Sequence, residues 1–194
     1  MAEDPVSRAD EPAQRLFLAV EVPPSARRVV AAVIRPWREA FPSARWLPSE
    51  NWHVTLKFLG RTPARLVTWV EETVGGIVGG HPPATARVQG LGAFPSARRA
   101  RVLWAGIDDP ARRLAGLAAD LETVLAEEFR AEMRRFHPHL TVARSEPPLR
   151  LPESYAETPL TSQAFVADRV VLFRSHLQGG STKYEPLRTF ALGE

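Results

Sequence analysis

The order of hydrophobic and polar residues predicts strands along much of the chain. Runs that are rich in β-branched and aromatic residues, and that are bounded by glycine, proline or charged residues, are typical of strands. Gly60 is expected to end one of these runs. We expect seven strands, over residues 15–22, 52–60, 87–94, 101–107, a segment that starts at 139, 164–175 and 183–192.

Two segments between these runs carry apolar residues at helical spacing. Residues 25–41 are expected to form a helix with Ser25 as its N-cap, and Pro36 predicts a kink or an early end in it. Thr62-Pro63 is expected to open a second helix over residues 64–78.

A third helix is predicted near residues 111–131, and Asp109-Pro110 precedes its start. Its apolar stripe is expected to consist of Leu114, Leu117, Leu121, Val124 and Leu125. The full order is strand, helix, strand, helix, two strands, helix and three strands. This order favours an α+β fold of two similar halves, each a small antiparallel sheet with helices outside.

One short phrase occurs twice, about half a chain apart, as His53-Val54-Thr55-Leu56 and His139-Leu140-Thr141-Val142. Because residues i and i+2 of a strand project from the same face, each copy presents an imidazole and a hydroxyl together and turns its apolar residues toward a core. Two imidazoles that face one cleft can donate and accept a proton in one catalytic cycle. The repeat therefore predicts acid and base catalysis that needs neither a metal nor a cofactor.

The composition is that of an ordinary globular protein of 194 residues, 44% of them hydrophobic and 24% charged. It contains no cysteine, which excludes disulfides, thiolate zinc sites and cysteine nucleophiles. No stretch approaches the roughly 20 apolar residues of a membrane span, and the N-terminus is unlike an export signal. We expect a cytoplasmic monomer that does not bind membranes, with residues 1–14 as a flexible N-terminal extension and residues 15–194 as one domain of two lobes.

The charge is only slightly positive, at a formal +3, but the cations are almost all arginine. Lys57 and Lys183 are the two lysines among 25 basic residues. Arginine binds phosphate through two parallel hydrogen bonds and stacks on bases, which suits an RNA end. A coding sequence of high GC content produces the same bias, so the charge is weak evidence for a polyanionic substrate.

Beyond the two repeated phrases, further short motifs follow a recognisable order, and together they extend from Arg15 to Leu192. They are Arg15-Leu16-Phe17 with Ala19 and Pro23, Trp46, HVTLKFLG, Gly92 with Phe94-Pro95, Val102-Leu103-Trp104, FHPHLTVAR, and Leu172 to Ser175 before Tyr184. With these motifs the chain resembles the two-histidine (2H) phosphoesterases, and among them the RNA 2',3'-cyclic phosphodiesterases, once described as 2'-5' RNA ligases.

This resemblance implies a bilobal fold with one motif on a central strand of each lobe and an active cleft between the lobes. It implies His53 as proton donor and His139 as proton acceptor, with Thr55 and Thr141 as substrate-binding residues. Arg144 matches a residue that contacts phosphate. Since Arg144 lies five residues beyond His139, it faces away from the motif unless the strand ends or bulges between them.

The activity implied is hydrolysis of RNA 2',3'-cyclic phosphate ends to 2'-phosphomonoesters, and in reverse 2'-5' RNA ligation. RNA with such an end is the expected partner, and no metal or cofactor is expected. Phe136, next to the second motif, is expected to stack on a terminal base. Other aromatic residues of the strands, such as Phe58, are expected to be mostly in the core.

Several other interpretations remain open. The same histidines could act on small cyclic phosphates of the ADP-ribose 1'',2''-cyclic phosphate type, or the protein could bind RNA ends without turnover. His137 and His139 could form a metal pair, but no third ligand cluster stands out in the sequence. Ser175-His176 lacks the surroundings of a serine nucleophile, and His81 is expected to be solvated.

Overall fold

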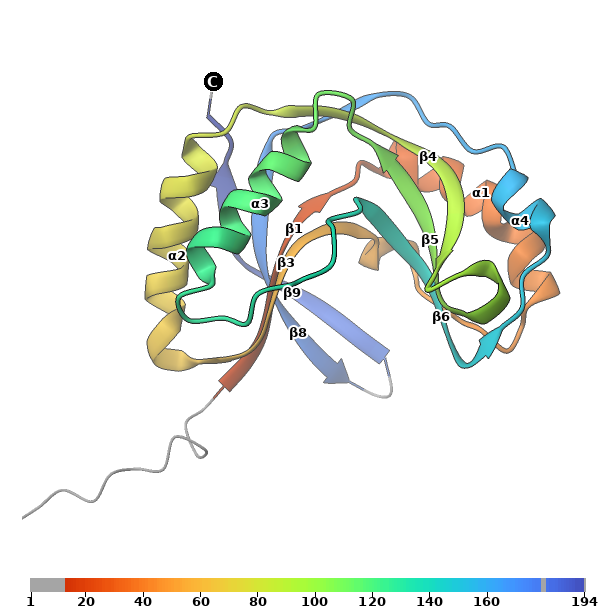
Figure 1. Ribbon diagram of the computed structural model, residues 1–194, viewed down its shortest axis with the longest axis horizontal. Helices are drawn as coiled ribbons and strands as arrows, with labels where there is room; N and C mark the ends of the chain where they lie inside the picture. The colour runs from red at the N-terminus through yellow and green to blue at the C-terminus, as the bar shows by residue number, and fades with distance from the viewer. Residues whose placement is uncertain (1–12, 179–180, 194) are drawn as a thin grey trace, which may run out of the picture.

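Nine strands form one curled antiparallel sheet in the computed structural model, which describes residues 13–178 and 181–193 (Figure 1). The order across the sheet is β7-β4-β5-β6-β3-β1-β8-β9, and β2 pairs with β6. The strands are β1 (Ala13–Glu21), β2 (Arg45–Trp46), β3 (His53–Pro63), β4 (Ala84–Phe94), β5 (Ala100–Asp108), β6 (His139–Leu149), β7 (Phe165–Ala167), β8 (Arg169–Gln178) and β9 (Ser181–Ala191).

The sheet divides into two halves at its narrowest connection. Strands β3, β1, β8 and β9 form the first lobe, and β2, β4, β5, β6 and β7 form the second. The pair Val54↔Leu140 is the β3 to β6 pairing that joins them. The predicted α+β arrangement of two small antiparallel sheets is confirmed, and the structure adds that the two sheets are continuous.

Two helices, α1 (Pro24–Ala40) and α3 (Arg113–Leu125), pack on the lobe opposite to the half of the chain from which they come. α2 (Ala64–Gly79) and α3 pack on each other and on the first lobe, although α3 comes from the second half of the chain. α1 and α4 (Glu153–Glu157) contact β4 of the second lobe, although α1 directly follows β1 (Figure 1). Short 3-10 helices occupy Ser49–Asn51 and Ala97–Arg99. Each lobe is therefore completed by a helix from the other half.

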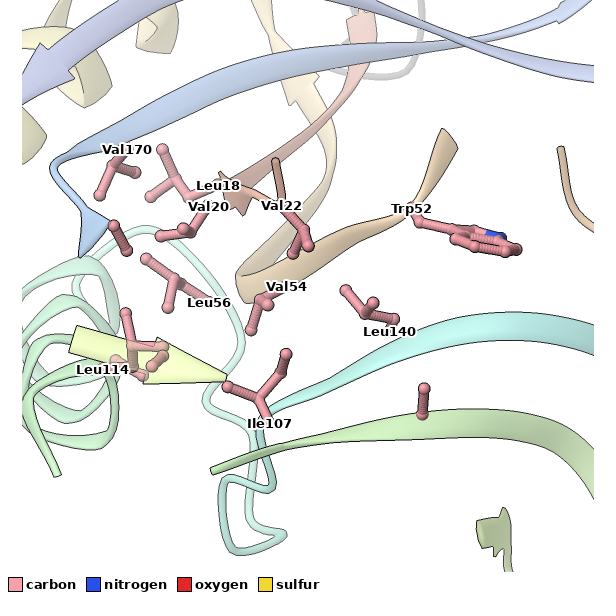
Figure 2. Close-up of a cluster of buried hydrophobic side chains, with 14 of the residues drawn as sticks. Leu18, Val20, Val22, Trp52, Val54, Leu56, Ile107, Leu114, Leu140 and Val170 are labelled. Atoms are coloured by element: carbon pink, nitrogen blue, oxygen red, sulfur yellow. The ribbon is translucent and has the colours of Figure 1, made fainter. Parts of the chain in front are cut away.

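The apolar residues of both repeated phrases enter one core that spans the two lobes. Val54, Leu140 and Val142 are fully buried, and Leu56 is 6% exposed. Figure 2 shows Val54, Leu56 and Leu140 in one cluster with Leu18 of β1 and Leu114 of α3. The predicted core face of each motif strand is confirmed.

The first helix differs from its prediction at its N-cap and at Pro36. Its N-cap is Pro23 rather than Ser25, and no side chain caps it. Pro36 does not end it, because the Ala32 carbonyl that loses its partner lies on an exposed turn where water can bond it. Burial of Val30 and Ile34 holds the helix through the proline.

The third helix is shorter than predicted, from Arg113 to Leu125. The Asp109 carboxylate accepts hydrogen bonds from three backbone N–H groups, of Arg113, Leu114 and Ala115, and so fixes the start. Val124, predicted to belong to the apolar stripe, is 37% exposed. The other four residues of the stripe are buried.

Several strand boundaries also differ, and three of the differences affect how the strands pair. The segment predicted as one strand over 164–175 divides at Asp168, where β7 pairs with β4 of the second lobe and β8 pairs with β1 of the first. β3 continues beyond Gly60, whose φ of +71° accommodates an irregularity in its pairing with β1. β1 begins at Ala13, two residues inside the predicted extension. Residues 1–12 of that extension lie outside the described part.

No helix among the described residues is long and apolar enough to cross a membrane.

Candidate active site

The two repeated phrases lie side by side because Val54 and Leu140 are paired across the antiparallel joint between the lobes. Around this pair His53 is diagonal to His139, and Thr55 is diagonal to Thr141. All four side chains are partly buried, and they alternate with the fully buried residues of the core. We call the surface that carries these four residues the motif face. The fold thus brings together the four residues that the repeat predicted.

His53 stands among aromatic rings of the first lobe. Its ring centroid lies 4.8 Å from that of Phe17, in a stacked geometry, and 5.0 Å from that of Tyr184, edge to face. Burial lowers the pKa of His53 to about 4, against a hydrogen bond with the Asn51 backbone that raises it. The charges of His139 and Arg144 lower this pKa further, which shows that the three groups share one electrostatic environment.

His139 has the equivalent setting in the second lobe. Its Nδ1 lies 2.7 Å from the His137 carbonyl oxygen, and because a carbonyl can only accept, Nδ1 carries the hydrogen. The neutral ring therefore presents Nε2 as a proton acceptor. Burial lowers the pKa of His139, so this neutral form prevails at pH 7. Each histidine thus bonds the backbone of the residue two positions before it, Asn51 or His137.

Arg144 lies on the motif face because β6 bulges. Thr141 pairs with Trp104 and Ala143 with Leu103, so Val142 is an extra residue between two consecutive partners. Val142 and Ala143 are both fully buried, and Arg144 is exposed on the same side as Thr141. Its charge lowers the pKa of both histidines. From the sequence, Arg144 would face the motif only if the strand ended or bulged before it. The structure shows this bulge.

β3 has the matching irregularity. Thr55 pairs with Ala19 and Lys57 with Leu18, so Leu56 is the extra residue. Phe58 consequently lies opposite Phe17 on the motif face, with its ring centroid 6.1 Å away, and is 65% exposed. The expectation that strand aromatics such as Phe58 belong to the core is wrong for this residue.

Phe136 is not brought to the histidines. It is partly buried against the main core, and among the described residues no ring contact joins it to His53 or His139. Phe94 and Trp104 are the rings beside His139, with centroids at 5.1 Å and 6.4 Å. His137 is exposed beside them, 4.8 Å from the Trp104 centroid.

The remaining histidines pair with carboxylates away from the motifs. His81 Nε2 lies 3.0 Å from Asp120 Oδ2 on α3, and His176 Nε2 lies 2.6 Å from Glu185 Oε2 on β9. Ser175 and His176 are consecutive on β8 and so project to opposite faces, which separates the two groups of a serine hydrolase couple. Among the described residues no group of three or more His, Cys, Asp or Glu could hold a metal ion.

Sequence reasoning missed Arg45. It belongs to the two-residue strand β2, where it pairs directly with Arg144. Two residues are too few to show a periodic pattern, and no motif identifies this position.

Residues 22–179 match the family model described as the 2'-5' RNA ligase superfamily. The RNA 2',3'-cyclic phosphodiesterase of Geobacillus stearothermophilus is 29% identical over 91% of this chain, and the chain spans 56% of that protein's length. The protein of the same name from Escherichia coli K12 is 32% identical over 92% of this chain and 97% of its own. The crystal structure of E. coli LigT complexed with 3'-AMP superposes with a TM-score of 0.75 at 28% identity, covering 94% of this chain and all of that one.

Proposed function

This chain belongs to the 2'-5' RNA ligase superfamily, and on that premise we propose that it hydrolyses 2',3'-cyclic phosphate ends of RNA to 2'-phosphates. The observation that carries the proposal is the juxtaposition of His53 and His139 on one sheet face, each with a hydrogen bond to the backbone two residues earlier. Relatives that carry the name RNA 2',3'-cyclic phosphodiesterase support the substrate.

Two protons move in this reaction. His139 accepts a proton from water through Nε2 while the water oxygen forms a bond to phosphorus. The bond from phosphorus to the ribose 3' oxygen breaks, and His53 in its protonated form gives that oxygen a proton. The product is a 2'-phosphate with a free 3'-hydroxyl. A 5'-hydroxyl in place of water would join two RNA ends through a 2'-5' linkage by the same transfers.

The other residues of the motif face suit the charge that develops on the phosphoryl group. The hydroxyls of Thr55 and Thr141 lie beside the histidines and can donate to the two nonbridging oxygens. Arg144 supplies a full positive charge on the same face. In the free protein burial favours neutral imidazoles, so His53 gains its proton when the anionic substrate enters and stabilises the imidazolium.

The proposal is tested with RNA that ends in a 2',3'-cyclic phosphate, in excess chelator, with the position of the product phosphate determined. We expect a 2'-phosphate product, formed as fast in chelator as without it. Hydrolysis should be about 10² to 10⁴-fold slower for His53→Ala and for His139→Ala. His81→Ala is the matched control, because His81 pairs with Asp120 outside the motif face. Loss of activity in chelator, or a 3'-phosphate product, would contradict the mechanism. RNA binding without any product would indicate a binding module instead.

A further inference from the structure

Arg45 and Arg144 oppose one another without a neutralising partner. They are directly paired residues of β2 and β6, a position in which side chains project to the same side with their Cβ atoms about 5 Å apart. Like charges at such positions repel. Neither arginine has a hydrogen bond or an ion pair with any residue in 13–178 or 181–193, whereas Arg101, Arg169 and Arg174 each pair with a carboxylate.

The pair lies on the motif face. Arg144 returns to that face at the Val142 bulge, and Arg45, as its direct partner, projects to the same side. The charges of both arginines act on Tyr184, whose ring is 5.0 Å from that of His53. Two unpaired guanidinium groups therefore stand beside the histidines, an arrangement that an anion would stabilise.

Arg45 and Arg144 lie on different strands, β2 and β6. β2 joins the same edge of β6 as β3 does, but Arg45 pairs at Arg144 whereas Val54 pairs at Leu140. Neighbouring strands are about 4.8 Å apart, and an arginine side chain is longer than this spacing, so the two guanidinium groups can reach different sites on the motif face. Arg144, which lowers the pKa of both histidines, is placed for the reacting phosphate. Arg45 is therefore available to bind a second phosphate group of the substrate.

We propose that Arg45 binds the phosphate on the 5' side of the nucleotide whose 2',3'-cyclic phosphate is hydrolysed. The inference rests on the proposed function and refines its substrate. An RNA end always carries that 5' phosphate as the phosphodiester to the preceding nucleotide, and a cyclic nucleoside monophosphate lacks it. Arginine suits the role because its planar group binds phosphate oxygens through two hydrogen bonds. Arg45 thereby selects RNA ends over free cyclic nucleotides.

Two substrates that differ in one group test this directly: adenosine 2',3'-cyclic phosphate and the same compound with a 5'-phosphate. We expect the 5'-phosphate to raise kcat/KM of the unaltered protein about tenfold, mainly through KM. Arg45→Gln should abolish most of that gain, and Arg45→Lys should restore part of it because a point charge remains. Arg35→Gln, which removes an exposed arginine of α1, is the charge-matched control and should keep the full gain.

The outcomes separate the two proposals. A 5'-phosphate gain that survives in Arg45→Gln, or an equal loss for both substrates, would overturn the role of Arg45. Absence of turnover of both compounds, and also of an RNA that ends in a 2',3'-cyclic phosphate, by the unaltered protein would overturn the proposed function alone. In that case the affinities for adenosine 2'-phosphate and adenosine 2',5'-bisphosphate still show whether Arg45 binds the 5' phosphate. Arg45→Gln must weaken the bisphosphate about tenfold more than the monophosphate, and equal weakening would refute the inference.

Discussion

Phe58 occupies in β3 the position that Arg144 occupies in β6. Each is the fifth residue after its histidine, and each reaches the motif face because the preceding pair of residues contains a bulge. The two strands are thus related in backbone geometry but differ in chemistry at this place, with an apolar ring in the first lobe and a guanidinium group in the second.

This equivalence provides a matched pair of variants. We expect Arg144→Gln to lower kcat/KM for a cyclic-ended RNA by about 10 to 100-fold, since it removes a charge-assisted contact with the phosphate. Phe58→Leu, at the equivalent position, keeps an apolar side chain and carries no charge to lose, so it should have a smaller effect. Steady-state kinetics of both variants checks the comparison. Equal losses would mean that the arginine charge is not what matters.

Burial of His53 makes the stability of the protein depend on pH. Its pKa is about 4 in the folded state and near 6.5 in the unfolded chain, so the unfolded chain binds the proton more tightly between those values. Stability must then fall as pH decreases through this range, by about 2 to 3 kcal/mol between pH 7 and pH 4.5. The free energy of unfolding can be measured in urea at pH 7 and at pH 4.5. Its decrease between the two pH values should be smaller in His53→Gln than in the unaltered protein, by that amount. The same drop in both proteins would show that His53 titrates normally when folded.

Lys57 is buried, 3% exposed, directly after the first motif. Its Nζ lies 2.6 Å from Glu122 Oε1 on α3 and 3.0 Å from the Arg130 carbonyl oxygen, and the same Glu122 oxygen accepts the Glu132 N–H. This network ties β3 and α3 to the connection that leads to His139.

Lys57→Met should lower the free energy of unfolding by about 3 kcal/mol, because Glu122 and the Arg130 carbonyl lose their partner. Since the Glu122 side chain is 25% exposed, water offsets part of the loss. The double variant Lys57→Met with Glu122→Gln should be more stable than the sum of the single changes predicts. Chemical denaturation of the four proteins measures this coupling, and strict additivity would contradict it.

Gly92 makes room for Trp104, its direct partner on β5. A Cβ at position 92 would lie 2.2 Å from Trp104 Cζ2, so Gly92→Ala must displace the rigid indole. We expect a loss of about 1 to 3 kcal/mol in stability and lower kcat/KM, since Trp104 pairs with Thr141 beside His139. Gly76→Ala on α2, where nothing lies within 4 Å of the added Cβ, should instead stabilise slightly. Thermal unfolding distinguishes the two, and an unchanged Gly92→Ala would contradict the close packing.

Much of the fold followed from local sequence patterns. Where the structure differs from the prediction, the cause is an interaction with a distant part of the chain. The sequence predicted an uninterrupted strand over 164–175, because nothing in its hydrophobic pattern marks the change of partner from β4 to β1 at Asp168. Pro36 is accommodated inside its helix because Ala32 is exposed, and that exposure depends on how the helix packs. Phe136 is near His139 in the sequence, but its side chain packs against the main core.

The sequence alone determined which residues of each motif share a face, because alternation along a strand is a property of the backbone and needs no neighbour. It therefore predicted the histidines and threonines together and their apolar neighbours in the core. Tertiary structure decided the rest of the motif face. Whether Arg144 points toward His139 depends on an extra residue in the pairing of β6 with β5, and Arg45 joins it only because β2 pairs with β6. Bulges and strand partners are set by hydrogen bonds to distant segments, and no pattern within a single strand encodes them.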